Sequence, residues 1–227
     1  FGTQAIVATP SYCMYLAEAA RGMADKYPME MYKLKYGILG SEGCTPEMRA
    51  EIENHWGNGF FCTDNYGMSE LNGPGMSGEC MYRDGLHINQ DHFLCEIIDS
   101  ASGKTLEKGA TGELVVTNLT KRGLPMLRYR TKDITNINYE PCKCGRTSAR
   151  MHKIIGRSDD MIKVRGVNVF PSQVETVIAK FENKLTMNYK LYVGREDNKD
   201  TFELAVELAD GIDVDNMKFL AELKTDV

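Results

Sequence analysis

The sequence predicts an α/β protein: a sheet with helices, then an antiparallel β subdomain, then part of a small α+β domain. Three observations support this prediction. Apolar strands and capped helices alternate before residue 60, strand-like runs dominate residues 86–138, and a helix–hairpin pattern follows residue 170. Alternation of strands and helices favours an α/β sheet, whereas consecutive strand-like runs favour antiparallel pairing.

The first elements are two strand–helix units. Residues 4–9 are expected to form a buried strand, and residues 36–40 form the next one. Thr9-Pro10 combines an N-cap residue with proline at the first helical position, ahead of an Ala-rich helix over residues 14–23. Thr45-Pro46 repeats this signal before apolar residues at helical spacing, namely Met48, Ile52 and Trp56.

The later elements are strands and one further helix. Residues 86–98, 112–118 and 125–138 are strand-like and separated by Gly- and Asp-rich turns, which predicts a β subdomain over about residues 79–150. A helix begins at Pro171, residues 188–194 and 201–208 predict a hairpin, and Asp213 could cap a last helix. The helix from Pro171 has an apolar face made of Val174, Val177, Ile178 and Phe181.

Composition excludes several classes of protein. A net charge of −5 and a pI of about 5.5 give no basic footprint for nucleic acid. The apolar runs are shorter than a membrane span and residues 1–4 do not have the pattern of a signal peptide, so we expect a cytoplasmic protein. Seven cysteines, an odd number, argue against a closed disulfide framework. Since Phe1 is not an initiator methionine and strand 4–9 lacks a preceding partner, we expect a piece of a longer chain.

Residues 62–70, Cys-Thr-Asp-Asn-Tyr-Gly-Met-Ser-Glu, carry the most chemical information. An aromatic ring beside a glycine can stack on a base while the backbone approaches closely. The hydroxyl of Ser69 can bond a phosphate oxygen, and the carboxylate of Glu70 can hold Mg²⁺. Two more segments follow: Tyr-Arg-Thr-Lys-Asp at 129–133 and Gly-Arg-Ser-Asp-Asp-Met-Ile-Lys-Val-Arg-Gly at 156–166.

Together and in this order, the three segments resemble the nucleotide-binding core of the adenylate-forming enzymes, the acyl-CoA synthetase superfamily. Phenylacetate–CoA ligase and its coenzyme F390 synthetase-like relatives are the most similar group. The resemblance runs from Ala8 to about Glu175. It implies that residues 1–157 are the C-terminal part of the large AMP-binding domain and 158–227 an incomplete, mobile C-terminal domain.

The resemblance also assigns nucleotide-binding roles. The Gly40–Gly43 segment, with Ser41 and Glu42, would line one side of adenine, and Asp133 would accept hydrogen bonds from the ribose hydroxyls. Lys132 stands where the family usually has glycine. The remaining residues would contact adenine, phosphate or Mg²⁺: Asp64, Asn65, Tyr66, Gly67, Ser69 and the catalytic Glu70.

Arg157 and Asp159 resemble the hinge that precedes the mobile C-terminal domain. The resemblance implies that Arg157 reaches ribose or phosphate and that Asp159 serves catalysis by absorbing the backbone rotation. A hinge suits a two-step reaction, because adenylation and thiol attack need different groups over the same carbonyl. The alternative is a charged turn with no such role.

Cys80, His87, Cys142 and Cys144 have the side-chain types of a closed tetrahedral zinc site. Cys-x-Cys-Gly-Arg recurs in proteins similar to phenylacetate–CoA ligase, and some relatives carry zinc there. The site would be structural, with no catalytic water. His92 is a rival for the histidine position and Cys95 for a thiolate, although Cys95 alternates with apolar residues and is interpreted as core.

The resemblance implies part of an ATP-dependent acyl- or aryl-CoA ligase that uses ATP, Mg²⁺ and CoA. The expected acid is an aryl acetate, with Tyr12 and the Gly73–Gly75 loop lining its pocket, and a homodimer is left open. The family's phosphate loop and catalytic lysine segment are not recognisable, and the neighbours of Lys224 do not match. The alternatives are adenylyl transfer to another acceptor and a non-catalytic nucleotide- or zinc-binding fragment.

Overall fold

The computed structural model describes residues 2–164, 167–181, 183–196, 199–209 and 211–212. The chain divides into two compact units, Phe1–Ile154 and Ile155–Val227. The first unit holds the α/β sheet and the β subdomain, and the described residues of the second include a helix and a long hairpin. The helix expected near Asp213 lies outside the described residues.

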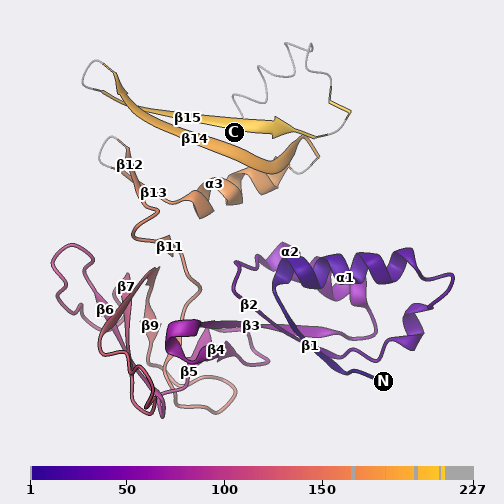
Figure 1. Cartoon of the computed structure of the whole chain (residues 1–227), viewed down its shortest axis with the longest axis horizontal. Helices are drawn as coiled ribbons and strands as arrows, with labels where there is room; N and C mark the ends of the chain where they lie inside the picture. The colour runs from indigo at the N-terminus through magenta and orange to yellow at the C-terminus, as the bar shows by residue number, and fades with distance from the viewer. Residues whose placement is uncertain (1, 165–166, 182, 197–198, 210, 213–227) are drawn as a thin grey trace. The chain divides into compact units, whose positions relative to one another are not determined.

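The first unit begins with a three-stranded parallel sheet that is covered by helices. Strand β2 pairs in parallel with both β1 and β3. Helices α1 and α2 lie on the same face of these strands (Figure 1). The elements are β1 (Ala5–Ala8), α1 (Pro10–Gly22), η1 (Met29–Met31), β2 (Tyr36–Gly40), α2 (Pro46–Trp56), β3 (Phe61–Met68) and η2 (Ser69–Leu71).

Both predicted helix starts are confirmed. The side-chain oxygen of Thr9 accepts from the Tyr12 N–H, and that of Thr45 accepts from the Met48 N–H. Ile52 and Trp56 are buried against Cys13 and Ala17 of α1, as the spacing predicts. The expected burial of residues 4–9 was wrong: Val7 is 68% exposed. The helices cover only one face of the sheet, so side chains on the other face of β1 remain accessible.

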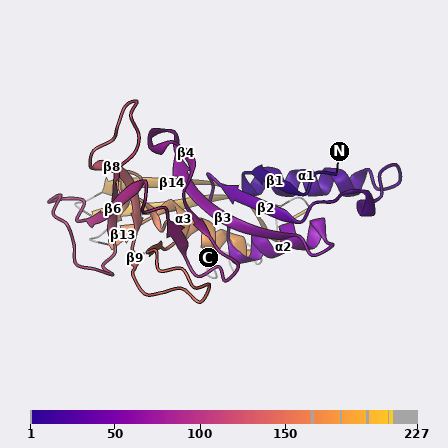
Figure 2. The same cartoon turned by 90° about the horizontal axis from the view of Figure 1, so that it is seen from below.

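The β subdomain follows as antiparallel strands in two sheets. The first sheet has the order β1-β2-β3-β4-β5-β10-β9, and β7 pairs with both β6 and β8 in the second. Figure 2 shows β2 and β3 side by side, leading toward β4. Apolar side chains of both sheets form one core. The strands are β4 (Gly73–Glu79), β5 (Leu86–Ile88), β6 (Phe93–Ile98), β7 (Gly112–Asn118), β8 (Tyr129–Thr135), β9 (Ile137–Asn138) and β10 (Arg150–Met151).

The run at residues 86–98, expected to be strand-like throughout, is two strands in different sheets. Ile88 at the end of β5 pairs with Ser77, whereas Phe93 at the start of β6 pairs with Asn118. A turn closes the step between them, with the His92 N–H donating to the Asn89 carbonyl. The polar residues between the strands mark this crossing from one sheet to the other.

The second unit contains the predicted helix and hairpin. Val174 and Ile178 of α3 are buried against apolar residues of β14 and β15, which pair in antiparallel fashion. Its elements are β11 (Gly156–Arg157), β12 (Ile162–Val164), β13 (Val167–Val169), α3 (Pro171–Ile178), η3 (Ala179–Phe181), β14 (Leu185–Glu196) and β15 (Lys199–Leu208). In the described parts of both units, no helix combines the length and apolar character needed to cross a membrane.

Lys132 occupies a strained position within β8. Its φ is +70°, in the left-handed region that favours glycine. The register of β7 and β8 shifts here, because Glu113 pairs with Ile134 while Val115 pairs with Arg130. Such a bulge re-aims the side chain that follows it, which is Asp133. The glycine expected from the resemblance is therefore the residue that this backbone favours.

Replacing Lys132 with glycine is expected to stabilise the protein by about 0.5–1 kcal/mol. A left-handed side chain costs about 1–2 kcal/mol, part of which the greater unfolded-state entropy of glycine offsets. Urea unfolding of the wild type and Lys132→Gly would measure the difference. Lys104→Gly, at an exposed lysine that has no positive φ, is the matched control and should not gain stability. A lower midpoint for Lys132→Gly would contradict the strain argument.

Candidate active site

A cavity of about 330 Å³ lies at the carboxyl ends of the parallel strands in the first unit. The register aligns Ala8 with Leu39 and Gly40 with Asn65, so β1, β2 and β3 end at one edge. Open α/β sheets bind ligands at this edge. The cavity is lined by Val7, Ala8, Thr9, Ile38, Leu39, Gly40, Ser41, Asn65, Gly67, Met68, Ser69, Gly73 and Pro74.

Four of the predicted nucleotide-binding residues line this cavity: Ser41, Asn65, Gly67 and Ser69. Gly73 and Pro74, predicted to line the acid pocket, share it. Two segments more than twenty residues apart in sequence, around Ser41 and around Asn65, thus face the same space. The walls offer amide and hydroxyl groups beside apolar ones, which is the composition of a small-molecule site.

Close backbone contacts explain the glycines in the cavity wall. A Cβ on Gly67 would lie 2.4 Å from the Gly73 carbonyl oxygen, and one on Gly40 would lie 2.4 Å from the Asn65 carbonyl oxygen. Any larger residue at either position would push the wall apart. Ser41 beside them has a φ of +69°, a conformation that is uncommon for serine.

Tyr66 and Asp133 meet directly, although 67 residues separate them in sequence. The Tyr66 hydroxyl donates to Asp133 Oδ2 at 2.5 Å, and the Asp133 N–H donates to Thr131 Oγ1 at 3.1 Å. Burial, followed by the neighbouring Asp133, raises the pKa of Tyr66, so its phenol stays protonated. The Tyr66 ring packs on the subdomain core. Tyr66 is not among the residues that line the cavity.

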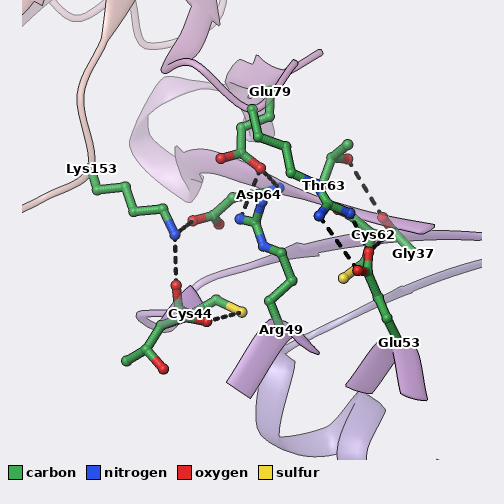
Figure 3. Close-up of polar contacts among 11 residues, drawn as sticks. Gly37, Cys44, Arg49, Glu53, Cys62, Thr63, Asp64, Glu79 and Lys153 are labelled. Carbon is green, nitrogen blue, oxygen red and sulfur yellow. Dashed lines mark hydrogen bonds and ion pairs between the residues drawn. The ribbon is translucent and has the colours of Figure 1, made fainter. Parts of the chain in front are cut away.

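Asp64 and Glu42 also use their carboxylates elsewhere. Asp64 does not line the cavity, and its Oδ2 lies 3.6 Å from Lys153 Nζ (Figure 3). The Glu42 carboxylate accepts from the Ser11 N–H at 3.2 Å, which places it at the N-terminus of α1. Glu70 is exposed on η2, with its carbonyl accepting from Lys121 Nζ at 2.7 Å. Tyr12 is exposed on α1 and does not line the cavity.

Cys80, His87, Cys142 and Cys144 converge in the β subdomain. One ligand atom from each lies within 4.8 Å of the other three. The Cys80 and Cys142 sulfurs are 3.8 Å apart, and Cys144 Sγ is 3.5 Å from His87 Nε2. His87 Nδ1 contacts Ser148 Oγ at 3.0 Å, and burial lowers the pKa of His87, which favours the neutral imidazole. The rivals lie elsewhere: His92 contacts Thr120, and Cys95 packs on the core.

Arg157 and Asp159 belong to the second unit. The guanidinium holds the Asp159 carboxylate through two bonds, Nε to Oδ1 at 3.0 Å and Nη2 to Oδ2 at 2.9 Å. Asp160 lies 3.7 Å from the same guanidinium. The segment predicted to be a hinge is thus a turn in which an arginine contacts two carboxylates.

Sequence reasoning missed several residues of this region. Thr9 and Ile38 line the cavity because they stand at or near the ends of β1 and β2. Strand polarity could have identified them, since the carboxyl ends of parallel strands share an edge. Arg49, Glu79 and Lys153 form ion pairs beside β3, at positions far apart along the chain. No local pattern marks these three residues.

Known proteins similar to this chain point to one family. Residues 166–227 match the AMP-binding enzyme C-terminal domain. Phenylacetate-coenzyme A ligase of Thermus thermophilus is 44% identical over 92% of this chain and 46% of that protein. The same enzyme of Escherichia coli is 43% identical, again over 92% and 46%. The chain therefore spans about half the length of these relatives.

Solved structures agree on the fold. 2-Hydroxyisobutyryl-CoA ligase, in the postadenylation state with R3-HIB-AMP, is 27% identical with a TM-score of 0.77. The match covers 99% of this chain and 47% of that one. The amide bond synthetase McbA from Marinactinospora thermotolerans, 19% identical with a TM-score of 0.61 over 98% and 46%, shares the fold alone. The chain has the fold of part of an adenylate-forming enzyme, and its sequence is similar to about half of phenylacetate-coenzyme A ligase.

Proposed function

We propose that this chain is part of an ATP-dependent acyl- or aryl-CoA ligase. The carboxylate of the acid would attack the α-phosphorus of ATP and release pyrophosphate. The thiol of CoA would then attack the acyl carbonyl and release AMP. The observation that carries the proposal is the cavity at the carboxyl ends of β1, β2 and β3, where the two predicted adenine segments and Ser69 line one space.

The residues around the cavity suit a nucleotide. Glycines at positions 40 and 67 leave a flat wall that a planar base could approach, and Asn65 offers an amide. Asp133 would accept hydrogen bonds from the ribose hydroxyls, and the Tyr66 hydroxyl would hold that carboxylate in place. In this proposal Tyr66 positions Asp133, and adenine lies against the glycines.

Further groups would act on phosphate, acid and thiol. Ser69 would bond a phosphate oxygen, and Glu70 would offer a hard oxygen ligand to Mg²⁺, which would neutralise charge on the phosphates. Gly73 and Pro74 would border the acid, for which an aryl acetate is proposed. A cytoplasmic location and a homodimer also belong to this proposal.

The protein that contains this chain should release pyrophosphate from ATP only when a carboxylic acid is present. Phenylacetate should be preferred over acetate and benzoate, and addition of CoA should give one phenylacetyl-CoA per AMP. Coupled pyrophosphate and thioester assays would measure both steps. Transfer of AMP to another acceptor without CoA would favour adenylyl transfer instead, and no acid-dependent release of pyrophosphate would contradict the ligase proposal.

The four converging ligands fit zinc. With zinc–sulfur bonds of about 2.3 Å and zinc–nitrogen bonds of about 2.0–2.1 Å, tetrahedral geometry places sulfurs about 3.8 Å apart and sulfur and nitrogen about 3.6 Å apart. The observed distances are 3.8 Å and 3.5 Å. We therefore propose that Cys80, His87, Cys142 and Cys144 hold a structural zinc ion. Their set is complete, so they would hold the strands together and activate no water.

The zinc proposal predicts one zinc ion per chain in protein purified without chelator. Cys142→Ser should lose the metal and melt several degrees lower, because metal binding contributes to folding free energy. Metal analysis and thermal unfolding would test both expectations. Cys95→Ser and His92→Ala change the two rival ligands and serve as matched controls that keep zinc. The site would be refuted if wild-type protein purified without chelator contained no zinc and melted at the same temperature as Cys142→Ser.

The hinge proposal predicts that the two half-reactions respond differently to a locked backbone. Asp159→Pro fixes φ near −65° at the proposed pivot. In the complete protein, pyrophosphate release should survive while thioester formation falls, since the second step requires domain motion. Asp160→Ala, at the neighbouring carboxylate, should retain both steps. If both steps fall by the same factor in a folded variant, the segment is a static turn.

A further inference from the structure

A cluster of four charged side chains, three of them largely buried, lies beside β3 in the first unit (Figure 3). We name Arg49, Asp64, Glu79 and Lys153 the Asp64 cluster. The side chains of Arg49 and Glu79 are 8% and 2% exposed, and that of Asp64 is 12% exposed. Lys153 is the most exposed member, at 43%, and is the penultimate residue of the first unit.

The contacts join four separate segments of the chain. Arg49 of α2 pairs with Glu79 of β4 at 2.9 Å, and Glu79 also accepts the Asp64 N–H at 2.8 Å. Lys153 Nζ lies 3.6 Å from Asp64 Oδ2 and donates to the Cys44 carbonyl at 2.6 Å. In Figure 3 the Lys153 ammonium lies between the Asp64 carboxylate and the Cys44 carbonyl.

Lys153 compensates a buried negative charge. Arg49 is already paired with Glu79, and Lys153 is the cation that pairs with the Asp64 carboxylate. Burial raises the pKa of Asp64, and Lys153 is the strongest influence in the opposite direction. Removing one partner of a buried ion pair is costly because the other charge is left uncompensated. The strand that carries Asp64 would then have to shift or take up a proton.

Both residues that Lys153 contacts are close in sequence to residues that line the cavity. Asp64 is followed by Asn65, and Cys44 comes three residues after Ser41. Ser41 and Asn65 both line the cavity. Successive residues of a strand point to opposite faces, so an anchor on Asp64 fixes the direction of Asn65. The Lys153 ammonium group therefore restrains the two segments that carry Ser41 and Asn65 without lining the cavity itself.

We propose that Lys153 is a positioning residue for nucleotide binding, which it serves by holding Asp64 and the Cys44 carbonyl without touching the nucleotide. The proposal rests on the function proposed above, because it takes the cavity to be the nucleotide site. It also assigns Asp64 the role of an anchor behind the site in place of an adenine contact.

The experiment measures MgATP binding by calorimetry in the complete protein that contains this chain. Lys153→Met should weaken binding about tenfold, since it removes a charge-assisted hydrogen bond that orders two wall segments. Lys153→Arg retains the charge and should bind within about threefold of wild type. Lys104→Met, at an exposed lysine of the β subdomain, is the matched control and should bind like wild type. Melting temperatures of all variants are recorded alongside.

A double variant separates positioning from general damage to the fold. Asp64→Asn removes the charge that Lys153 compensates, so Lys153→Met with Asp64→Asn should bind MgATP better than Lys153→Met alone. Wild-type affinity in Lys153→Met would overturn the inference. So would additive losses in the double variant, or a loss of affinity matched by a large fall in melting temperature. If the wild type itself binds no MgATP, the proposed function fails before the inference is tested.

Discussion

The parallel pairing of β1, β2 and β3 decides where the polar groups of this chain gather. Each strand runs in the same direction, so Thr9, Ser41 and the residues after Asn65 all come at one edge of the sheet. Helices α1 and α2 start just beyond β1 and β2 and cover one face, with threonine caps at both starts. The cavity is a consequence of this polarity, because the chain must leave the sheet at that edge.

Three consecutive residues of strand β3 face three different environments. Asp64 joins the ion pairs beside α2, Asn65 faces the cavity, and the Tyr66 hydroxyl bonds Asp133 of the second sheet. The strand pleat separates Asp64 from Asn65, and the register shift after Tyr66 lets the strand turn toward the β subdomain. A short motif can thus face the cavity on one side and be anchored by ion pairs on the other.

Much of this organisation could be predicted from local patterns, and the failures have physical causes. Thr9 and Thr45 mark helix starts through cap chemistry that needs no tertiary information. The direction of Asp64 could not be predicted, because polar residues at positions 63, 64 and 65 give no alternation to set the pleat. Lys153 was missed since its contact with Cys44 spans 109 residues. Residue types and the family resemblance of Cys142-Lys143-Cys144-Gly145-Arg146 suggested Cys80, His87, Cys142 and Cys144, which the fold brings together.

The converging cysteines and the Asp64 cluster share one backbone segment. Glu79 accepts the Asp64 N–H, and the next residue, Cys80, faces Cys142. Adjacent residues of an extended chain point to opposite sides. Glu79 therefore contacts β3 on one side, and Cys80 contacts Cys142 on the other. Arg150 strengthens the same region by bonding Asp84 and the Glu140 carbonyl. The four proposed metal ligands are therefore linked to β3, and through it to the cavity wall at Asn65, by the peptide bond between Glu79 and Cys80.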